Sequence, residues 1–328
     1  MKRIITLLVL VLAMVISLAS CNSARYNDAL ALIEEGKYDE AYEALAALGS
    51  YKDAEELLSR FRYVPVTAKF ESEDGSYSIE FFYDSDNMPL RNILIDQDGH
   101  EHTSEYTYDE NKDLIKEFFI DYNNGETTYT YTYDENRNLI KEVYDHAQGE
   151  YHYIESEYDE LGRVTKVVTY YTDMQLDVEY FYDESGRAFK EVYTFGEETT
   201  VHEFTFDENG NKISATATDS LGTSTTTEYV YDENGRLVKE FEMGGEEELF
   251  SVIFTYDEDG NLTKEEATFL GETFYVYEYT YDENGNVIKL VYTDADGKTE
   301  TTEKEFKLVY IEKEVTKTIE KVLEFDYL

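Results

Sequence analysis

A basic residue stands seven positions after an Asp in eight of nine repeated segments of this sequence. These residues are Arg91, Lys116, Lys141, Lys166, Lys190, Lys239, Lys264 and Lys289, and Ser214 interrupts the column. In every segment a Tyr or Phe immediately precedes the Asp. Ammonium groups beside phenol rings can hold an anion and an apolar ring together, which suits an acidic glycan or peptide. The structural alternative is that the aliphatic stems pack on the rings while the charged ends reach water.

The candidate ligand-binding residues are therefore Tyr and Lys side chains of these segments. They are Tyr108, Lys116, Tyr133, Lys141, Lys166, Tyr182, Lys190, Tyr231, Lys239, Tyr256, Lys264, Tyr281 and Lys289. A glycan or a protein is the expected ligand, because both present polar groups together with apolar surface.

Catalytic and metal-binding patterns are not indicated. His100, His102, His146, His152 and His202 are scattered, and no Ser or Gly-rich stretch has the context of a nucleophile elbow or a phosphate loop. The chain has 73 acidic residues, so no single pair of carboxylates marks a glycosidase. The Asp-Glu-Asn-Gly segments lack the further ligands of a calcium loop. We predict a protein that is not an enzyme and has no cofactor and no specific metal site.

The charge balance of the chain limits the classes of molecule that can be its binding partners. A formal net charge of -45 argues against nucleic acid and against adhesion of the protein surface to anionic lipid. Disorder is not expected, because 32 Tyr and 18 Phe provide abundant apolar surface.

The elements that carry these residues follow from a repeat of 24 or 25 residues. Its Asp positions are 84, 109, 134, 159, 183, 207, 232, 257 and 282. Alternating apolar and polar residues flank each Asp turn, which predicts one β-hairpin per repeat. A two-residue type I′ turn and a type I turn followed by a left-handed residue both fit the segment. Leu161-Gly162 favours the second, because Leu at positive φ is costly. Asn87, Lys112 and Arg137 replace the Gly, so those turns should be looser or strained.

The two faces of each hairpin follow from the expected pairing. We expect the residue immediately before the Asp to pair with the fifth residue after the Asp. We also expect the third residue before the Asp to pair with the seventh residue after it. The basic column then lies on the aromatic face. Glu105 and Glu117 should face each other on the opposite, acidic face, as should Glu179 with Glu191 and Glu228 with Glu240.

The fold class expected is mainly β. Tandem hairpins of 24–25 residues form one antiparallel meander of about 19 strands, wound into an open roll or spiral with the aromatic face inside. A flat single-layer sheet is the alternative, and it would expose a long aromatic face. Residues 312–328 fit either a helix or a closing strand or hairpin, and we expect them to cap the final sheet edge.

The N-terminus resembles a bacterial lipoprotein signal. Lys2 and Arg3 precede an apolar run, and Leu18-Ala19-Ser20-Cys21 has the form of a lipobox. The resemblance implies cleavage before Cys21, lipid on its thiol, and an extracytoplasmic location in the bacterial cell envelope. Residues 21–63 have helical periodicity, and the string from Gly36 to Leu58 resembles a short tetratricopeptide-like hairpin. We expect this segment to be a cap or spacer.

The repeats resemble the YD-repeat, or RHS-repeat, family of bacterial surface and secreted proteins. The segments Tyr158 to Val164 and Tyr231 to Leu237 carry its signature. The expected organisation is a signal peptide (1–20), a helical segment (21–63), a YD-repeat sheet domain (64–311) and a C-terminal cap (312–328). The resemblance implies a membrane-anchored scaffold for binding or adhesion, with carbohydrate as one ligand class. The alternative is a structural or partner-protein scaffold that docks through the helical segment.

Overall fold

The computed structural model describes residues 22–146, 151–244 and 247–311, which form a helical segment followed by twenty β-strands. Residues 22–34 are helical, and α2 (Tyr38–Ala46) and α3 (Ala54–Leu58) follow. The strands are β1 (Phe61–Ser72), β2 (Gly75–Tyr83), β3 (Pro89–Asp96), β4 (Glu101–Tyr108), β5 (Leu114–Ile120), β6 (Glu126–Tyr133), β7 (Leu139–His146), β8 (Tyr151–Tyr158), β9 (Val164–Tyr170), β10 (Gln175–Tyr182), β11 (Ala188–Phe195), β12 (Glu198–Phe206), β13 (Lys212–Thr218), β14 (Ser224–Tyr231), β15 (Leu237–Gly244), β16 (Glu247–Tyr256), β17 (Leu262–Phe269), β18 (Glu272–Tyr281), β19 (Val287–Asp294) and β20 (Thr299–Tyr310).

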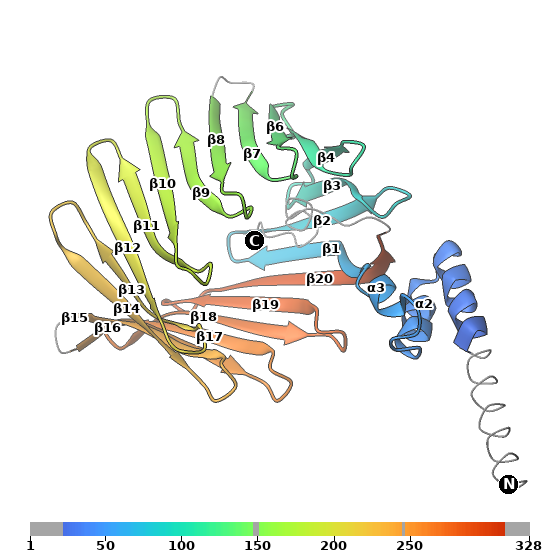
Figure 1. Cartoon of the computed structure of the whole chain (residues 1–328). Helices are drawn as coiled ribbons and strands as arrows, with labels where there is room; N and C mark the ends of the chain where they lie inside the picture. Colours follow the sequence, from blue (N-terminus) through green and yellow to red (C-terminus); the bar gives the residue numbers. More distant parts are fainter. Residues whose placement is uncertain (1–21, 147–150, 245–246, 312–328) are drawn as a thin grey trace, which may run out of the picture.

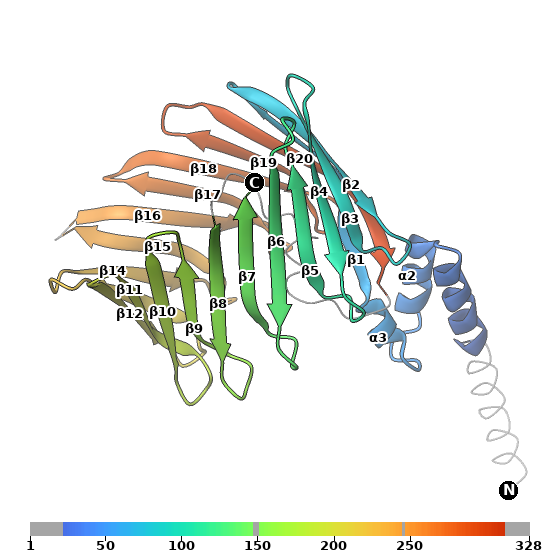
Figure 2. The same ribbon diagram turned by 90° about the horizontal axis from the view of Figure 1, so that it is seen from above.

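The sheet is a closed antiparallel barrel (Figures 1 and 2). Each strand pairs with the next along the chain, and β20 also pairs with β1 from Phe61 opposite Tyr310 to Glu71 opposite Thr301. The prediction of an open roll or spiral was therefore wrong. Twenty strands at about 4.8 Å give a circumference of about 96 Å, and accumulated twist can return such a sheet to its first strand. The seam is formed by two strands of 12 residues each, so the described sheet has no unpaired edge strand. The predicted C-terminal cap comprises residues 312–328. Those residues lie outside the described part of the chain.

Each repeat begins with the turn that the sequence predicts. In the repeat of Asp159, the Gly162 amide donates to the Asp159 carbonyl at 3.0 Å, and Gly162 has a φ of 75°. The Asp159 carboxylate accepts the backbone N–H groups of Leu161 and Arg163, both at 2.9 Å. The Asp is thus the residue that organises the turn, and the type I turn followed by a left-handed residue is confirmed.

The three turns without Gly keep this geometry. Asn87, Lys112 and Arg137 have φ values of 60°, 66° and 65°, and their amides still donate to the Asp carbonyl at 3.1 Å. The strain of positive φ is therefore present, as predicted, but the turns are not looser. Each side chain finds a partner in a neighbouring element. Lys112 pairs with Asp86 at 2.5 Å, and the Asn87 amide donates to the Tyr38 hydroxyl and the Tyr310 carbonyl at 3.0 and 2.9 Å.

A β-bulge next to each Asp turn changes the register of the hairpin. Tyr108 pairs with Leu114 as predicted, but Thr107 pairs with Lys116, which leaves Ile115 as the extra residue. The same shift occurs in every hairpin that begins at an Asp turn. The predicted pairing of the third residue before the Asp with the seventh after it was therefore wrong. A slip of one residue moves the whole return strand to the other face of the sheet.

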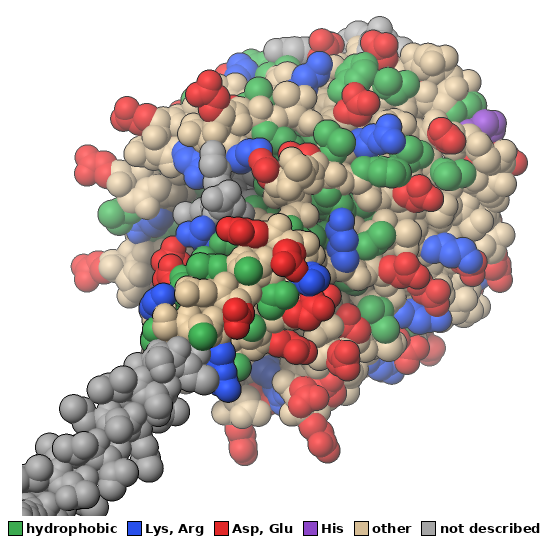
Figure 3. Space-filling model, turned by 90° about the vertical axis from the view of Figure 1, so that its right-hand side faces the viewer, with side chains coloured by type: hydrophobic (Ala, Val, Ile, Leu, Met, Phe, Trp, Pro, Cys, Tyr) green, Lys and Arg blue, Asp and Glu red, His purple; other side chains and the backbone are tan. Residues whose placement is uncertain are grey.

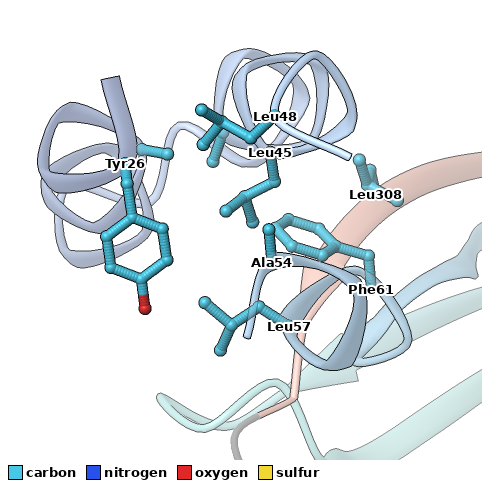
Figure 4. Close-up of a cluster of buried hydrophobic side chains, with 9 residues drawn as sticks. Tyr26, Leu45, Leu48, Ala54, Leu57, Phe61 and Leu308 are labelled. Carbon is cyan, nitrogen blue, oxygen red and sulfur yellow. The ribbon is translucent and has the colours of Figure 1, made fainter. Parts of the chain in front are cut away.

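The helical segment packs against the outside of the barrel beside the seam (Figures 1 and 4). Leu45, Ala54 and Leu57 from the helices form one buried cluster with Phe61 of β1 and Leu308 of β20. The periodic apolar residues of the helices are thus used to cover the strands that close the barrel. None of the helices within residues 22–146, 151–244 and 247–311 combines the length and the apolar character needed to span a bilayer.

Candidate functional site

The side chains of the helical cluster identify the inner face of the barrel. Phe61 and Leu308 point outward to the helices (Figure 4), so the alternating neighbours Val64 and Lys307 point inward. The Lys307 Nζ atom lies 4.5 Å above the ring of Tyr83. The column of aromatic residues that precede each Asp therefore faces the interior, as the sequence predicts.

The tyrosines of this column link neighbouring hairpins. Each hydroxyl donates to a backbone carbonyl 18 or 19 residues earlier, in the preceding hairpin, at 2.6–2.9 Å. The pairs are Tyr83 with Pro65, Tyr108 with Pro89, Tyr133 with Leu114, Tyr158 with Leu139, Tyr182 with Val164, Tyr231 with Lys212, Tyr256 with Leu237, and Tyr281 with Leu262. The candidate binding residues among them thus use their hydroxyls for structure, which leaves only ring faces for a ligand.

The basic column lies on the outer face, because the bulge transfers it there. Lys141 bridges Glu155 on the neighbouring strand at 2.7 Å, and Lys289 bridges Glu303 at 3.0 Å. Other members approach outward-facing aromatic rings, as Lys190 does with Phe181 at 5.5 Å. The remaining candidates Lys116, Lys166, Lys239 and Lys264 share this outer position. The structure therefore does not bring the candidate Lys and Tyr residues together, and the predicted groove lined by both is not formed.

The glutamates of the return strands lie on the inner face instead. Glu117 pairs with Tyr106, and Glu105 pairs with Phe118, so the predicted Glu105–Glu117 opposition was wrong. The same correction holds for Glu179 with Glu191 and for Glu228 with Glu240. Inner glutamates bond to tyrosines, as in the contact of 2.7 Å from the Tyr279 hydroxyl to Glu265. Burial and a hydrogen bond to Glu191 raise the pKa of Tyr193 to about 12.

Glu117 is the most buried of these carboxyl groups. Its residue is 8% exposed, and burial raises the pKa of its carboxyl group. A raised pKa in the folded state means that the folded chain binds the proton more tightly than the unfolded chain. Stability is therefore lost as the pH rises from the unfolded value of about 4.3 through the raised folded value.

We expect Glu117→Gln to remove this loss. The melting temperature of the variant relative to the wild type should be higher at pH 7.5 than at pH 4, because Gln carries no charge at either pH. Glu105→Gln on the exposed face of the adjacent strand is the matched control, because it removes the same charge without burial. If the difference in melting temperature between Glu117→Gln and the wild type were the same at both pH values, the raised pKa assigned to the buried Glu117 carboxyl group would be contradicted.

The two ends of the barrel differ in chemistry. The Asp turns lie at the helical end, where Figure 3 shows Asp and Glu side chains across the surface with Lys and Arg among them. The turns that connect successive repeats lie at the opposite end, which we call the distal rim. Its exposed apolar residues are Tyr122, Tyr171, Met174, Phe195, Leu221, Met243, Phe269, Leu270 and Phe274, with 46–90% of each residue accessible. The sequence analysis did not identify this rim, although Leu, Phe and Met residues in the predicted turns could have indicated an exposed apolar surface.

One group of possible metal ligands occurs among the described residues. Asp96, Asp98 and His100 share an inter-repeat turn, and their ligand atoms lie within 4.8 Å of one another. The turn itself uses them, since Asp96 accepts the backbone N–H groups of Asp98 and His100, each at 2.9 Å. The cluster is therefore explained by turn formation.

Comparison with known proteins gives one family match. Residues 147–289 match the family model of the Teneurin YD-shell. No curated protein matches the sequence. A crystal structure of TcdB2-TccC3-Cdc42 is 14% identical with a TM-score of 0.44, and the match covers 72% of this chain and 15% of that chain. A porin-like protein from Bacteroides uniformis is 13% identical with a TM-score of 0.31, covering 74% of this chain and 98% of that one. This chain thus spans about 15% of the length of the first of these.

Proposed function

We propose that this chain, which is a YD-repeat protein, is a non-catalytic scaffold held outside the bacterial cell by lipid on Cys21. Its distal rim binds a partner protein with a basic and partly apolar surface. The observation that carries this proposal is the arc of exposed apolar side chains on the distal rim. Soluble surfaces seldom expose so many large apolar residues in one region unless the region is an interface.

The charge of the distal rim supports a basic partner. Five consecutive inter-repeat turns, from the one after β9 to the one after β17, carry several Asp and Glu. Their described residues include no Lys or Arg; these are residues 171–175, 195–198, 218–224, 243–244, 247–248 and 269–274. Interfaces commonly place apolar anchors within a charged rim, and complementary charge speeds association.

A scaffold role fits the way in which the repeated residues are used. The Asp residues organise turns, the inner tyrosines bond to the preceding hairpin, and outer Lys and Glu pair across strands. The helical segment is a weaker candidate for docking, because its apolar residues Leu45 and Leu57 are buried against the barrel seam. We do not propose the hypothesis of carbohydrate binding through a surface shared by Tyr and Lys, because the Tyr column and the Lys column lie on opposite faces of the sheet.

The position of the helical end supports presentation of the rim away from the membrane. Cys21 directly precedes the helical residues 22–34, and these pack through Tyr26 and Ala29 into the cluster beside the seam. The distal rim is at the other end of the strands. A lipid at Cys21 would therefore hold the helical end nearest the bilayer, and two or more acyl chains suffice for a stable anchor.

Lipid attachment is tested with Cys21→Ser. Cells that express the wild type are grown with an alkyne fatty acid, and the protein should carry the label and sediment with membranes. Cys21→Ser should lose the label and appear in the soluble fraction. A labelled serine variant, or an unlabelled wild type, would contradict the anchor.

Binding through the rim is tested by photo-crosslinking in the same cells. A benzophenone residue is placed at Phe195 on the distal rim, and at Leu161 in an Asp turn as the matched control. Both side chains are exposed, by 46% and 77%. We expect a protein adduct only from position 195, and it should be lost when Phe269 and Phe274 are changed to Ser. Equal adducts from both positions, or none at 195, would overturn the proposed surface.

A further inference from the structure

A cavity on the inner face lies beside the barrel seam, near the distal rim. It has a volume of about 300 Å³ and is lined by Phe70, Tyr77, Tyr277, Leu290, Tyr292, Glu300 and Thr302. These residues come from β1, β2, β18, β19 and β20, so the site exists only because the barrel closes. A volume of this size is at the lower end of small-molecule sites.

Four aromatic rings form much of the lining. Phe70 and Tyr77 stack with ring centroids 4.7 Å apart, and Tyr277 and Tyr292 are 5.0 Å apart at an angle of 43°. Within the described part of the chain, the hydroxyls of Tyr77, Tyr277 and Tyr292 form no side-chain hydrogen bond. The tyrosines before each Asp differ in this respect, because each of their hydroxyls donates a hydrogen bond to a neighbouring hairpin. The hydroxyls of these three tyrosines therefore do not contribute to the hydrogen bonds that link neighbouring hairpins.

The electrostatics of the cavity favour a positive ligand. Aromatic faces carry partial negative charge, and the lining adds the carboxylate of Glu300 without any basic side chain. Burial, with Glu300 as a further cause, raises the pKa of Tyr77, so its phenol stays neutral at physiological pH. Glu265 adds negative charge near Tyr277 on the same inner face. A neutral ligand would gain the ring contacts but nothing from these charges.

We propose that this cavity binds a small organic cation, a quaternary ammonium or a protonated amine, between the rings of Tyr77, Tyr277 and Tyr292 and the carboxylate of Glu300. The methyl or methylene groups of such a cation pack on the ring faces, while its charge is balanced by Glu300. This site is independent of the distal rim and of the lipid anchor, and it uses none of the residues proposed for them.

The probe is choline, and its neutral isostere 3,3-dimethyl-1-butanol is the matched ligand control. Binding to the full chain in neutral detergent is followed by isothermal titration and by the chemical shifts of the choline methyl groups. We expect saturable choline binding, with an affinity at least about fivefold higher than that of the isostere. Glu300→Gln should weaken choline binding by about fivefold and leave the isostere unaffected.

Three further variants distinguish an effect on the cavity from a general change in charge or folding. Glu272→Gln removes one exposed acidic charge outside the lining, and choline affinity should not change. Tyr292→Phe keeps the ring and should bind choline normally, whereas Tyr292→Ala should lose binding while melting as a folded barrel. Equal affinity for choline and its isostere, an equal loss in Glu272→Gln, or no saturable choline binding would each overturn the proposal.

Discussion

Replacing Arg137 with methionine is expected to destabilise the barrel by about 3 kcal/mol, because it leaves the Asp113 carboxylate buried and unpaired. The Asp113 side chain is only 3% exposed. Arg137 reaches it from the next repeat with three hydrogen bonds of 2.7–3.2 Å. The free energy of unfolding, measured by denaturant titration with far-ultraviolet circular dichroism, provides the test.

Two comparisons make this result specific to the buried pair. Arg163→Met breaks a pair within a single turn, where the Asp159 side chain is 23% exposed, and it should cost less than about 1 kcal/mol. The double variant Asp113→Leu with Arg137→Met should recover most of the loss, because no charge then remains buried. If the double variant were as unstable as Arg137→Met, the loss would come from packing or from the backbone of residue 137 rather than from the charge.

Among substitutions by Ala at the fifth residue after each Asp, Leu114→Ala should lower the free energy of unfolding most, by about 3 kcal/mol. Leu114 is fully buried in an inner cluster with Val64, Met88 and Val309, close to the seam. Truncation would leave a cavity in this cluster, which neighbouring side chains fill only in part. The change in midpoint of denaturant unfolding measures the loss.

Leu262→Ala is the matched control because Leu262 occupies the same repeat position but is only partly buried. Both leucines also accept a tyrosine hydroxyl through their backbone carbonyls, which neither substitution removes. We expect Leu262→Ala to cost about 1 kcal/mol. Equal losses at the two positions would mean that the inner face is packed uniformly around the barrel, rather than densely at the seam alone.

The local structure of each repeat could be predicted from the sequence because it depends on contacts between residues close in the chain. Asp159 followed by Gly162 determines the turn, since a short carboxylate can accept nearby N–H groups and Gly tolerates positive φ. Alternating residues on both sides indicate strands, and the spacing of Ala41, Leu45 and Leu57 indicates helices. The inward direction of the tyrosines also followed from this pattern.

The alternation of apolar and polar residues was not sufficient to assign the basic column to the correct face of the sheet. Leu114 and Ile115 are both apolar, so either can be read as the inward residue, and the bulge decides between them. Two signals could have revealed the bulge. Adjacent apolar residues recur at this place, as in Leu139-Ile140, and Lys141 precedes its partner Glu155 by 14 residues, as Lys289 does Glu303.

The sequence by itself determined the hairpin, its turn and the aromatic face, because each depends on a few neighbouring residues. Only the tertiary structure decided that the sheet closes, since pairing of β1 with β20 joins residues about 240 positions apart and depends on twist summed over all twenty strands. Closure in turn created the covered seam, the dense cluster around Leu114 and the aromatic cavity near Glu300. The charged columns were likewise assigned to their faces by the one-residue bulge, whose effect extends along the whole return strand.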